Sequence, residues 1–335
     1  MKLPTLCIDL GSSNTKIYQI GTGVVLNEPS VIAISESGKR RVKAAGIEAK
    51  RLIGKTVSDT QVFSPIFEGN VEDELGASLM LENFLNKVTL RKLGKRPSVL
   101  FAVPCGAENA SIKKFEKLLN ECDVFGIHFV ESPVLTALGM GIPLTEATPC
   151  FIIDIGGGST KLAAVSLGGV ISGISVNMGG RSIDKMLIEY IDREYGLRIG
   201  SLTAESIKIQ IGSLLQGDLT TTTVRGRDVS TGQPRAITLN ASEIYEPIKA
   251  FFDKIFQLAS MVMSKLPAEI SAEIRRTGVY FAGGTSKIIG LTEYFRYSVG
   301  IKANTCEDPD LATAVGAGIV AGHSKLLSHL RINRR

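Results

Sequence analysis

The sequence lacks the features that mark secreted proteins and strongly charged nucleic-acid binders. Its five cysteines are odd in number and scattered, and no two have the spacing of metal ligands (Cys7, Cys105, Cys122, Cys150 and Cys306). We therefore expect reduced core residues, not disulfides or a metal site. No block of like charge dominates the 38 basic and 33 acidic residues, so no nucleic-acid partner is expected.

Long apolar runs are also missing. None reaches the roughly 18 residues that suggest a membrane-spanning helix, and residues 1–4 lead at once into a predicted strand, which leaves no room for a signal peptide. These absences predict a cytoplasmic protein that meets a membrane only peripherally. The 335 residues, 44% of them hydrophobic, are enough for two domains with separate cores.

One glycine-rich stretch carries the strongest functional signal. Residues 151–153 predict a short buried strand that ends at Asp154, and residues 162–167 predict the next strand. Between them lie small residues whose backbone N–H groups can approach an anion closely: Gly156, Gly157, Gly158, Ser159 and Thr160. The result is a hairpin, unlike a P-loop, where the glycines open a helix.

A second copy of this stretch lies near the N-terminus. Asp9 aligns with Asp154, and a lysine follows each acid at the same offset. In the first copy, the residues between the acid and the lysine include Gly11, Ser12, Ser13, Asn14 and Thr15. The match indicates an internal duplication. Two such hairpins facing each other would clamp a polyphosphate, and Asp9 and Asp154 would bind Mg²⁺ there. The alternative, two ordinary strand–turn–strand elements, explains one copy better than two.

Hydrophobic periodicity predicts the remaining elements. Strands are expected at residues 6–10, 15–20, 24–34 with a break near 27–29, 99–103, 129–131, 170–176, 220–224, 235–239 and 279–282. Helices are expected at residues 74–88, 109–122, 133–141, 183–195, 206–214, 242–264, 287–297 and 311–330, with Thr203 as the N-cap of the fifth.

Further segments resemble the actin superfamily and, within it, the MreB family, over almost the whole chain: residues 23–33, 45–56, 166–169, 199–212 and 226–234. The resemblance implies an α/β, two-domain actin-like ATPase fold with a duplicated ribonuclease-H-like core and two smaller subdomains. Domain I would take residues 1–141 plus 310–335, with a small subdomain at about 35–65. Domain II would take residues 142–309, with a small subdomain at about 181–245.

The resemblance also implies ATP and Mg²⁺ as cofactors. Residues 11–15 and 156–160 would contact the phosphates, and residues 283–286 (Gly283, Gly284, Thr285 and Ser286) would face the adenosine, with Thr285 narrowing the pocket. Glu205 and Lys208 would bracket ribose and adenine; the alternative for these two is an ordinary surface ion pair.

Two positions depart from the family pattern. In the family, a glutamate directly before a proline positions the attacking water, and Ser132 occupies that position here. Glu131 lies one residue earlier, and on a strand a shift of one residue points the side chain to the opposite face. The catalytic candidates are therefore Glu131, Ser132 and Asp154, and a slow ATPase is expected. The second departure is Arg181, where the family commonly has an acid.

The family's members form filaments beneath the cytoplasmic membrane, so the resemblance implies a homopolymer that directs cell shape and cell-wall synthesis. Membrane-embedded cell-wall elongation proteins would be its partners. The basic loop 90–96 would contact an anionic membrane, with Leu90 and Leu93 inserting and the basic side chains Lys92, Lys95 and Arg96 attracted to the surface. The basic tail 331–335 would add to this attraction. The alternatives are a monomeric chaperone-like or regulatory ATPase, a small-molecule kinase and a non-hydrolysing scaffold.

Overall fold

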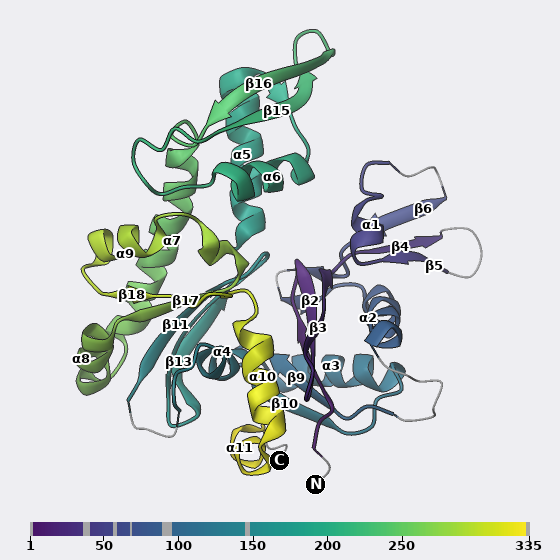
Figure 1. The fold of residues 1–335 in the computed structure, drawn as a ribbon, viewed down its shortest axis with the longest axis vertical. Coiled ribbons are helices and arrows are strands. Elements are labelled where there is room, and N and C mark those ends of the chain that lie inside the picture. Colours follow the sequence, from purple (N-terminus) through teal and green to yellow (C-terminus); the bar gives the residue numbers. More distant parts are fainter. Residues whose placement is uncertain are drawn as a thin grey trace.

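The computed structural model describes residues 3–35, 41–55, 59–67, 69–88, 96–144 and 148–332. Of the loop expected to meet a membrane, only Arg96 belongs to these ranges, and Arg334 and Arg335 of the tail also lie outside them. Within the described residues, no helix is long and apolar enough to cross a bilayer. The chain forms two lobes, each built on a five-stranded sheet (Figure 1).

The first lobe contains the sheet β10-β9-β1-β2-β3. Its strands are β1 (Leu6–Leu10), β2 (Asn14–Gln19), β3 (Gly23–Pro29), β9 (Val99–Val103) and β10 (Ile127–Glu131). Strand β1 pairs antiparallel with β2 and parallel with β9. The helices α2 (Glu74–Val88) and α3 (Asn109–Glu121) share a hydrophobic core with this sheet, because their apolar residues recur at helical spacing.

The second lobe repeats this topology in the sheet β13-β12-β11-β17-β18. Its strands are β11 (Cys150–Ile155), β12 (Thr160–Ser166), β13 (Gly169–Val176), β17 (Val279–Ala282) and β18 (Ala303–Asn304). Asp9 lies opposite Lys16 in one hairpin and Asp154 opposite Lys161 in the other. The equal register confirms the duplicated core. Helices α5 (Gly180–Tyr195), α7 (Tyr245–Ser264), α8 (Ala268–Thr277) and α9 (Leu291–Val299) contribute to its core.

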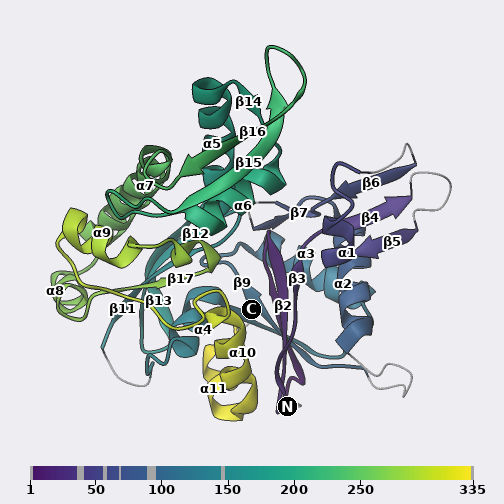
Figure 2. The same ribbon diagram turned by 45° about the horizontal axis from the view of Figure 1, so that its top comes forward.

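Each lobe carries a small sheet as a separate unit (Figure 2). On the first lobe, β4 (Ile32–Ser35) lies between β5 (Val42–Ala45) and β6 (Thr60–Phe63), beside the short helix α1 (Ile47–Lys50); the two-stranded β7 (Ile66–Phe67) and β8 (Asn70–Val71) follow. On the second, β15 (Thr221–Asp228) pairs with β14 (Leu197–Arg198) and β16 (Pro234–Asn240), beside α6 (Ser201–Ile211).

The lobes are joined by two helices that cross closely, α4 (Ser132–Gly139) and α10 (Ala312–Gly322). Buried side chains of both helices and both large sheets form one shared core. The predicted single helix at 311–330 is wrong: the extended backbone of His323 separates α10 from α11 (Ser324–Leu330). The predicted Thr203 cap is also wrong, because α6 begins at Ser201 after Gly200.

Candidate functional site

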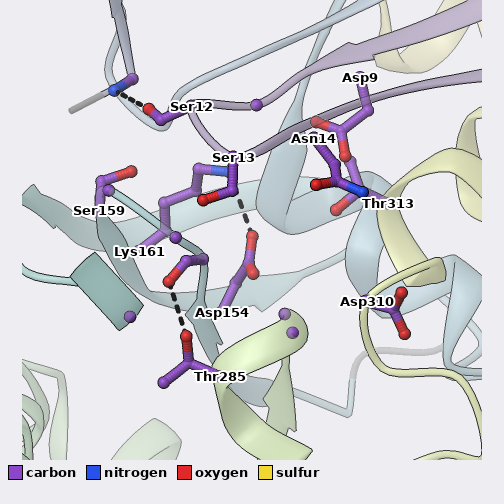
Figure 3. Close-up of a pocket in the computed structure, with 18 of the residues that line it drawn as sticks. Asp9, Ser12, Ser13, Asn14, Asp154, Ser159, Lys161, Thr285, Asp310 and Thr313 are labelled. Atoms are coloured by element: carbon purple, nitrogen blue, oxygen red, sulfur yellow. Dashed lines mark hydrogen bonds and ion pairs between the residues drawn. The ribbon is translucent and has the colours of Figure 1, made fainter. Parts of the chain in front are cut away.

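A cavity of about 390 Å³ lies where the two hairpins meet (Figure 3). This volume lies within the roughly 300–1,000 Å³ of small-molecule sites. Both glycine-rich turns line it with the residues expected from the sequence: Gly11, Ser12, Ser13 and Asn14 of the first turn, and Gly156, Gly157, Gly158 and Ser159 of the second. The structure therefore brings together segments about 145 residues apart in the chain, as the internal match predicts.

The two turns are built alike, because each glycine amide bonds to a carbonyl three residues on. The Gly11 amide donates to Asn14 O at 3.2 Å, and the Gly156 amide donates to Ser159 O at 2.9 Å. A side chain on either glycine would crowd the same carbonyl, at 2.7 Å for Gly11 and 3.1 Å for Gly156. Glycine thus suits the tight turn that each hairpin makes.

The two threonines that end the turns support the backbone instead of lining the cavity. The buried Thr15 hydroxyl pairs with Ser30 Oγ at 2.9 Å, and the Thr160 hydroxyl donates to the carbonyl of Met178 at 2.6 Å. We infer that their contribution to ligand binding is indirect.

Each hairpin places one carboxylate at the cavity, beside a lysine. Lys16 Nζ lies 3.4 Å from Asp9 Oδ2, and Lys161 Nζ lies 3.1 Å from Asp154 Oδ2. Burial alone would lower the pKa of Lys161, but the carboxylates of Asp154 and Asp9 raise it, so the ammonium keeps its charge. The two hairpins therefore contribute two positive and two negative groups to the cavity.

This donor set fits a Mg²⁺ ion that shares its coordination with a ligand. Mg²⁺ prefers oxygen atoms and is usually bound through one or two carboxylates, with phosphates and water completing its shell. Asp9 and Asp154 supply two carboxylates to the cavity. Among the described residues, no group of three or more His, Cys, Asp or Glu could hold a metal ion alone.

The loop after β17 forms another wall of the cavity. Gly283 has φ +83°, and a side chain there would meet Ile155 O at 2.3 Å, so only glycine fits. The 3₁₀ helix η2 (Gly284–Lys287) follows, and the Thr285 hydroxyl donates to Gly156 O at 2.9 Å, which ties this loop to the second turn (Figure 3). Ser286 donates to Gly283 O at 2.7 Å and stabilises the loop from within.

Glu205 and Lys208 on α6 both line the cavity, but each is paired elsewhere. Lys208 Nζ donates to Asp184 Oδ1 at 2.7 Å and to a carbonyl of α5 at 3.0 Å. Glu205 Oε2 accepts from Lys50 Nζ at 2.6 Å, and Lys50 belongs to α1 on the opposite lobe. Glu205 thus takes part in an ion pair across the cleft.

The adjacent Glu131 and Ser132 point in different directions. Glu131 ends β10, is not among the residues that line the cavity, and accepts the Gly106 amide at 2.9 Å through Oε1. Ser132 begins α4, lines the cavity and is 2% exposed, and its Oγ has no hydrogen-bond partner among the described residues. The strand-to-helix junction therefore presents the serine to the cleft.

Some site residues escape sequence reasoning. Lys16 and Lys161 are matched between the two hairpins in the sequence, and that match is the signal that could have assigned them to the site. Asp310 lines the cavity and pairs with Lys287 at 2.5 Å. It had no local signal, since it lies in the irregular segment between β18 and α10 and joins the site only through the fold.

Two lobes of equal topology, each with a small additional sheet and with a glycine-lined cleft between them, define the actin-like class. A family model described as MreB/Mbl protein matches residues 4–329. The chain therefore belongs to the MreB/Mbl family, whose relatives are named for determining cell shape.

Similar proteins agree over nearly full length. The cell shape-determining protein MreB of Escherichia coli (strain K12) is 35% identical over 318 residues, covering 93% of this chain and 92% of the relative. The cell shape-determining protein Mbl of Bacillus subtilis (strain 168) is 33% identical over 315 residues, covering 93% and 94%. The crystal structure of MreB 5 of Spiroplasma citri bound to AMPPNP has a TM-score of 0.91 at 28% identity and covers 98% of both chains.

Proposed function

We propose that this chain binds ATP with Mg²⁺ in the cleft and polymerises into filaments that direct cell shape. The observation that carries the proposal is the pair of matched turns, Gly11–Asn14 and Gly156–Ser159 in register, which line one cavity from two lobes. A similar protein of the same family is described as bound to AMPPNP, an ATP analogue.

In this proposal each group in the cleft has a defined task. Apart from Gly11 and Gly156, whose amides bond within their turns, the amides of the two turns donate to phosphate oxygens, and Lys16 offers a further positive charge. Asp9 and Asp154 would hold Mg²⁺, which supplies positive charge beside the phosphates. The loop at Gly283 and Gly284 accommodates the nucleoside, since no side chain there blocks its approach.

Hydrolysis is proposed to be slow. A carboxylate can accept a proton from an attacking water, and general-base catalysis of this kind contributes roughly 10²–10⁴-fold. Ser132 replaces that carboxylate in the cavity wall, while Glu131 is held by the Gly106 amide. ATP hydrolysis would then act as a timer for filament turnover, whereas a non-hydrolysing scaffold would show no steady-state phosphate release.

The filaments are proposed to lie at the inner face of the cytoplasmic membrane, with membrane-embedded cell-wall elongation proteins as partners. The basic loop 90–96 would contact anionic lipid, each basic side chain contributing about 1 kcal/mol near the surface. Replacing Lys92, Lys95 and Arg96 by Glu should abolish co-flotation with anionic liposomes. Unchanged flotation would reject this loop as the contact.

High-speed pelleting tests the proposal. Purified protein is centrifuged with Mg-ATP, Mg-ADP and no nucleotide in the same salt, with fluorescent ATP binding measured in parallel. We expect most of the protein in the pellet with Mg-ATP alone. Protein that binds ATP but stays soluble in all three conditions would instead support a monomeric ATPase, and the absence of nucleotide binding would reject the proposed site.

A further inference from the structure

Arg181 has no role in the nucleotide chemistry above. It lies in the first turn of α5 on the second lobe, and its amide donates to Gly157 O at 2.8 Å. The preceding amide, of Gly180, donates to Gly156 O at 2.9 Å. The start of α5 is therefore fixed to the second glycine-rich turn, because the turn's carbonyls satisfy N–H groups that a helix N-terminus leaves free.

The side chain of Arg181 leaves this lobe and reaches the first one. Its Nη2 donates to the carbonyl of Ser12, in the first glycine-rich turn, and lies 3.4 Å from Ser64 Oγ. One residue thus bonds to both turns, through its backbone to Gly157 and through its guanidinium to Ser12. An ionised acid at this position could not donate to a carbonyl.

The acceptor of this bond is itself held firmly. Ser12 Oγ accepts the Gly69 amide at 2.8 Å, and Ser64 Oγ, whose hydroxyl donates to Ile66 O at 2.9 Å, lies 3.3 Å from Ser12 O. The bond from Arg181, on α5, to the carbonyl of Ser12 therefore restrains the separation of the two lobes. The ion pair between Lys50 and Glu205, at 2.6 Å, crosses the cleft at a second point.

The charge around Arg181 agrees with this arrangement. Burial lowers the pKa of Arg181, while the nearby carboxylates of Glu205 and Asp184 act in the opposite direction. The guanidinium is thus desolvated and lies close to Glu205, the residue that Lys50 binds from the first lobe. A hydrogen bond from a charged, desolvated donor is among the stronger kinds in proteins.

We propose that Arg181 is a positioning residue that latches the two glycine-rich turns at ligand-binding separation before a nucleotide arrives. The expected effect on nucleotide affinity rests on the proposed function. A cleft that is already closed binds nucleotide without first having to close. ATP and ADP would gain equally, because the bond to Ser12 forms independently of the γ-phosphate.

The test compares R181A and R181K with wild type. Spin-labelled non-natural amino acids replace Glu48, in α1 beside the small sheet of the first lobe, and Thr223, in the small sheet of the second lobe; both residues are exposed. The distance between the two labels is measured by double electron–electron resonance without nucleotide. We expect one short distance in wild type, a longer and broader distribution in R181A, and an intermediate one in R181K. An R181A distribution equal to that of wild type overturns the proposal.

Affinity for fluorescent ATP and ADP gives the second readout. We expect R181A to weaken both by about tenfold, since affinity scales with the closed fraction. Loss of ATP affinity alone would mean that the guanidinium contacts the γ-phosphate, and overturns the latch. R193A is the matched control, because Arg193 lies on the same helix and pairs with its exposed neighbour Glu194. Should wild type bind no nucleotide, the proposed function fails while the distances still decide the role of Arg181.

Discussion

Ser132 shows how one side chain can set the chemistry of an otherwise complete cavity. Its hydroxyl is buried in the cavity wall and has no hydrogen-bond partner among the described residues. An unpaired buried hydroxyl costs free energy, so natural proteins seldom keep one without a reason. In this cleft, a water or a ligand bound in the cavity is the available partner.

We expect S132E to raise steady-state phosphate release with Mg-ATP by at least about tenfold. The substitution places a carboxylate at the start of α4, where the side chain faces the cavity, and so restores a general base. Phosphate release is measured on protein matched for nucleotide binding.

S132A is the control for this change, since it removes the hydroxyl without adding a base. We expect its rate to stay within about threefold of wild type. A rate in S132E no higher than in S132A would mean that this position does not reach the attacking water.

At the scale of elements, the helices α4 and α10, which join the lobes, cross closely. A side chain on Gly139 would lie 1.8 Å from Ala312 O, and one on Gly316 would lie 1.8 Å from Leu135 O. The two helix backbones are therefore in direct contact, and the hydroxyls of Thr136 and Thr313 pair at 2.9 Å beside it. Rigid backbone, unlike a flexible side chain, cannot move aside locally.

We therefore expect G316A to force α4 and α10 apart and to lower the free energy of unfolding by about 1–3 kcal/mol or more, measured by urea denaturation. G322A is the matched control on the same helix, because no atom lies within 4 Å of its added methyl group. That control should change stability by no more than about 1 kcal/mol. Equal stability of the two variants would contradict a tight crossing.

Periodicity and turn residues predict single elements well in this chain. The helix at 74–88 and the strands at 99–103 and 279–282 have the predicted bounds, because strong apolar patterns end at polar or glycine residues. The error at His323 comes from weighing apolar periodicity over 311–330 above the local residues: Gly322 ends α10 and Ser324 begins α11, and glycine and serine are helix stop and start signals.

Some features of the site follow from neighbouring residues in the sequence, and others depend on long-range contacts. Its glycines follow from the duplicated pattern, because turn geometry is local. The orientation of Glu131 and the bond from Arg181 to Ser12 depend on how β10 meets α4 and how the lobes close. Those are long-range contacts, which one sequence does not encode in neighbouring residues.

For the molecule as a whole, the decisive quantity is the separation of the lobes. Ser13 of the first turn and Gly157 of the second are in contact: a side chain on Gly157 would lie 1.7 Å from Ser13 Oγ. The two turns are thus as close as these residues allow. The phosphates of any nucleotide in the cleft therefore bind between two glycine-rich turns, which act as a clamp. The distance between the turns, the width of this clamp, is set by side-chain volume at the contact of Ser13 with Gly157.

We expect G157A to hold the lobes apart and to weaken ATP binding by at least about tenfold, because the added methyl group collides with Ser13 across the cleft. The double variant S13G/G157A removes both Oγ and Cβ of Ser13, the atoms that the methyl group would meet at 1.7 and 2.5 Å. ATP affinity should then return to within about threefold of wild type, a coupling that a double-mutant cycle of fluorescent ATP titrations measures. If the double variant binds as weakly as G157A, the loss comes from the second turn itself, and the width of the clamp is set elsewhere.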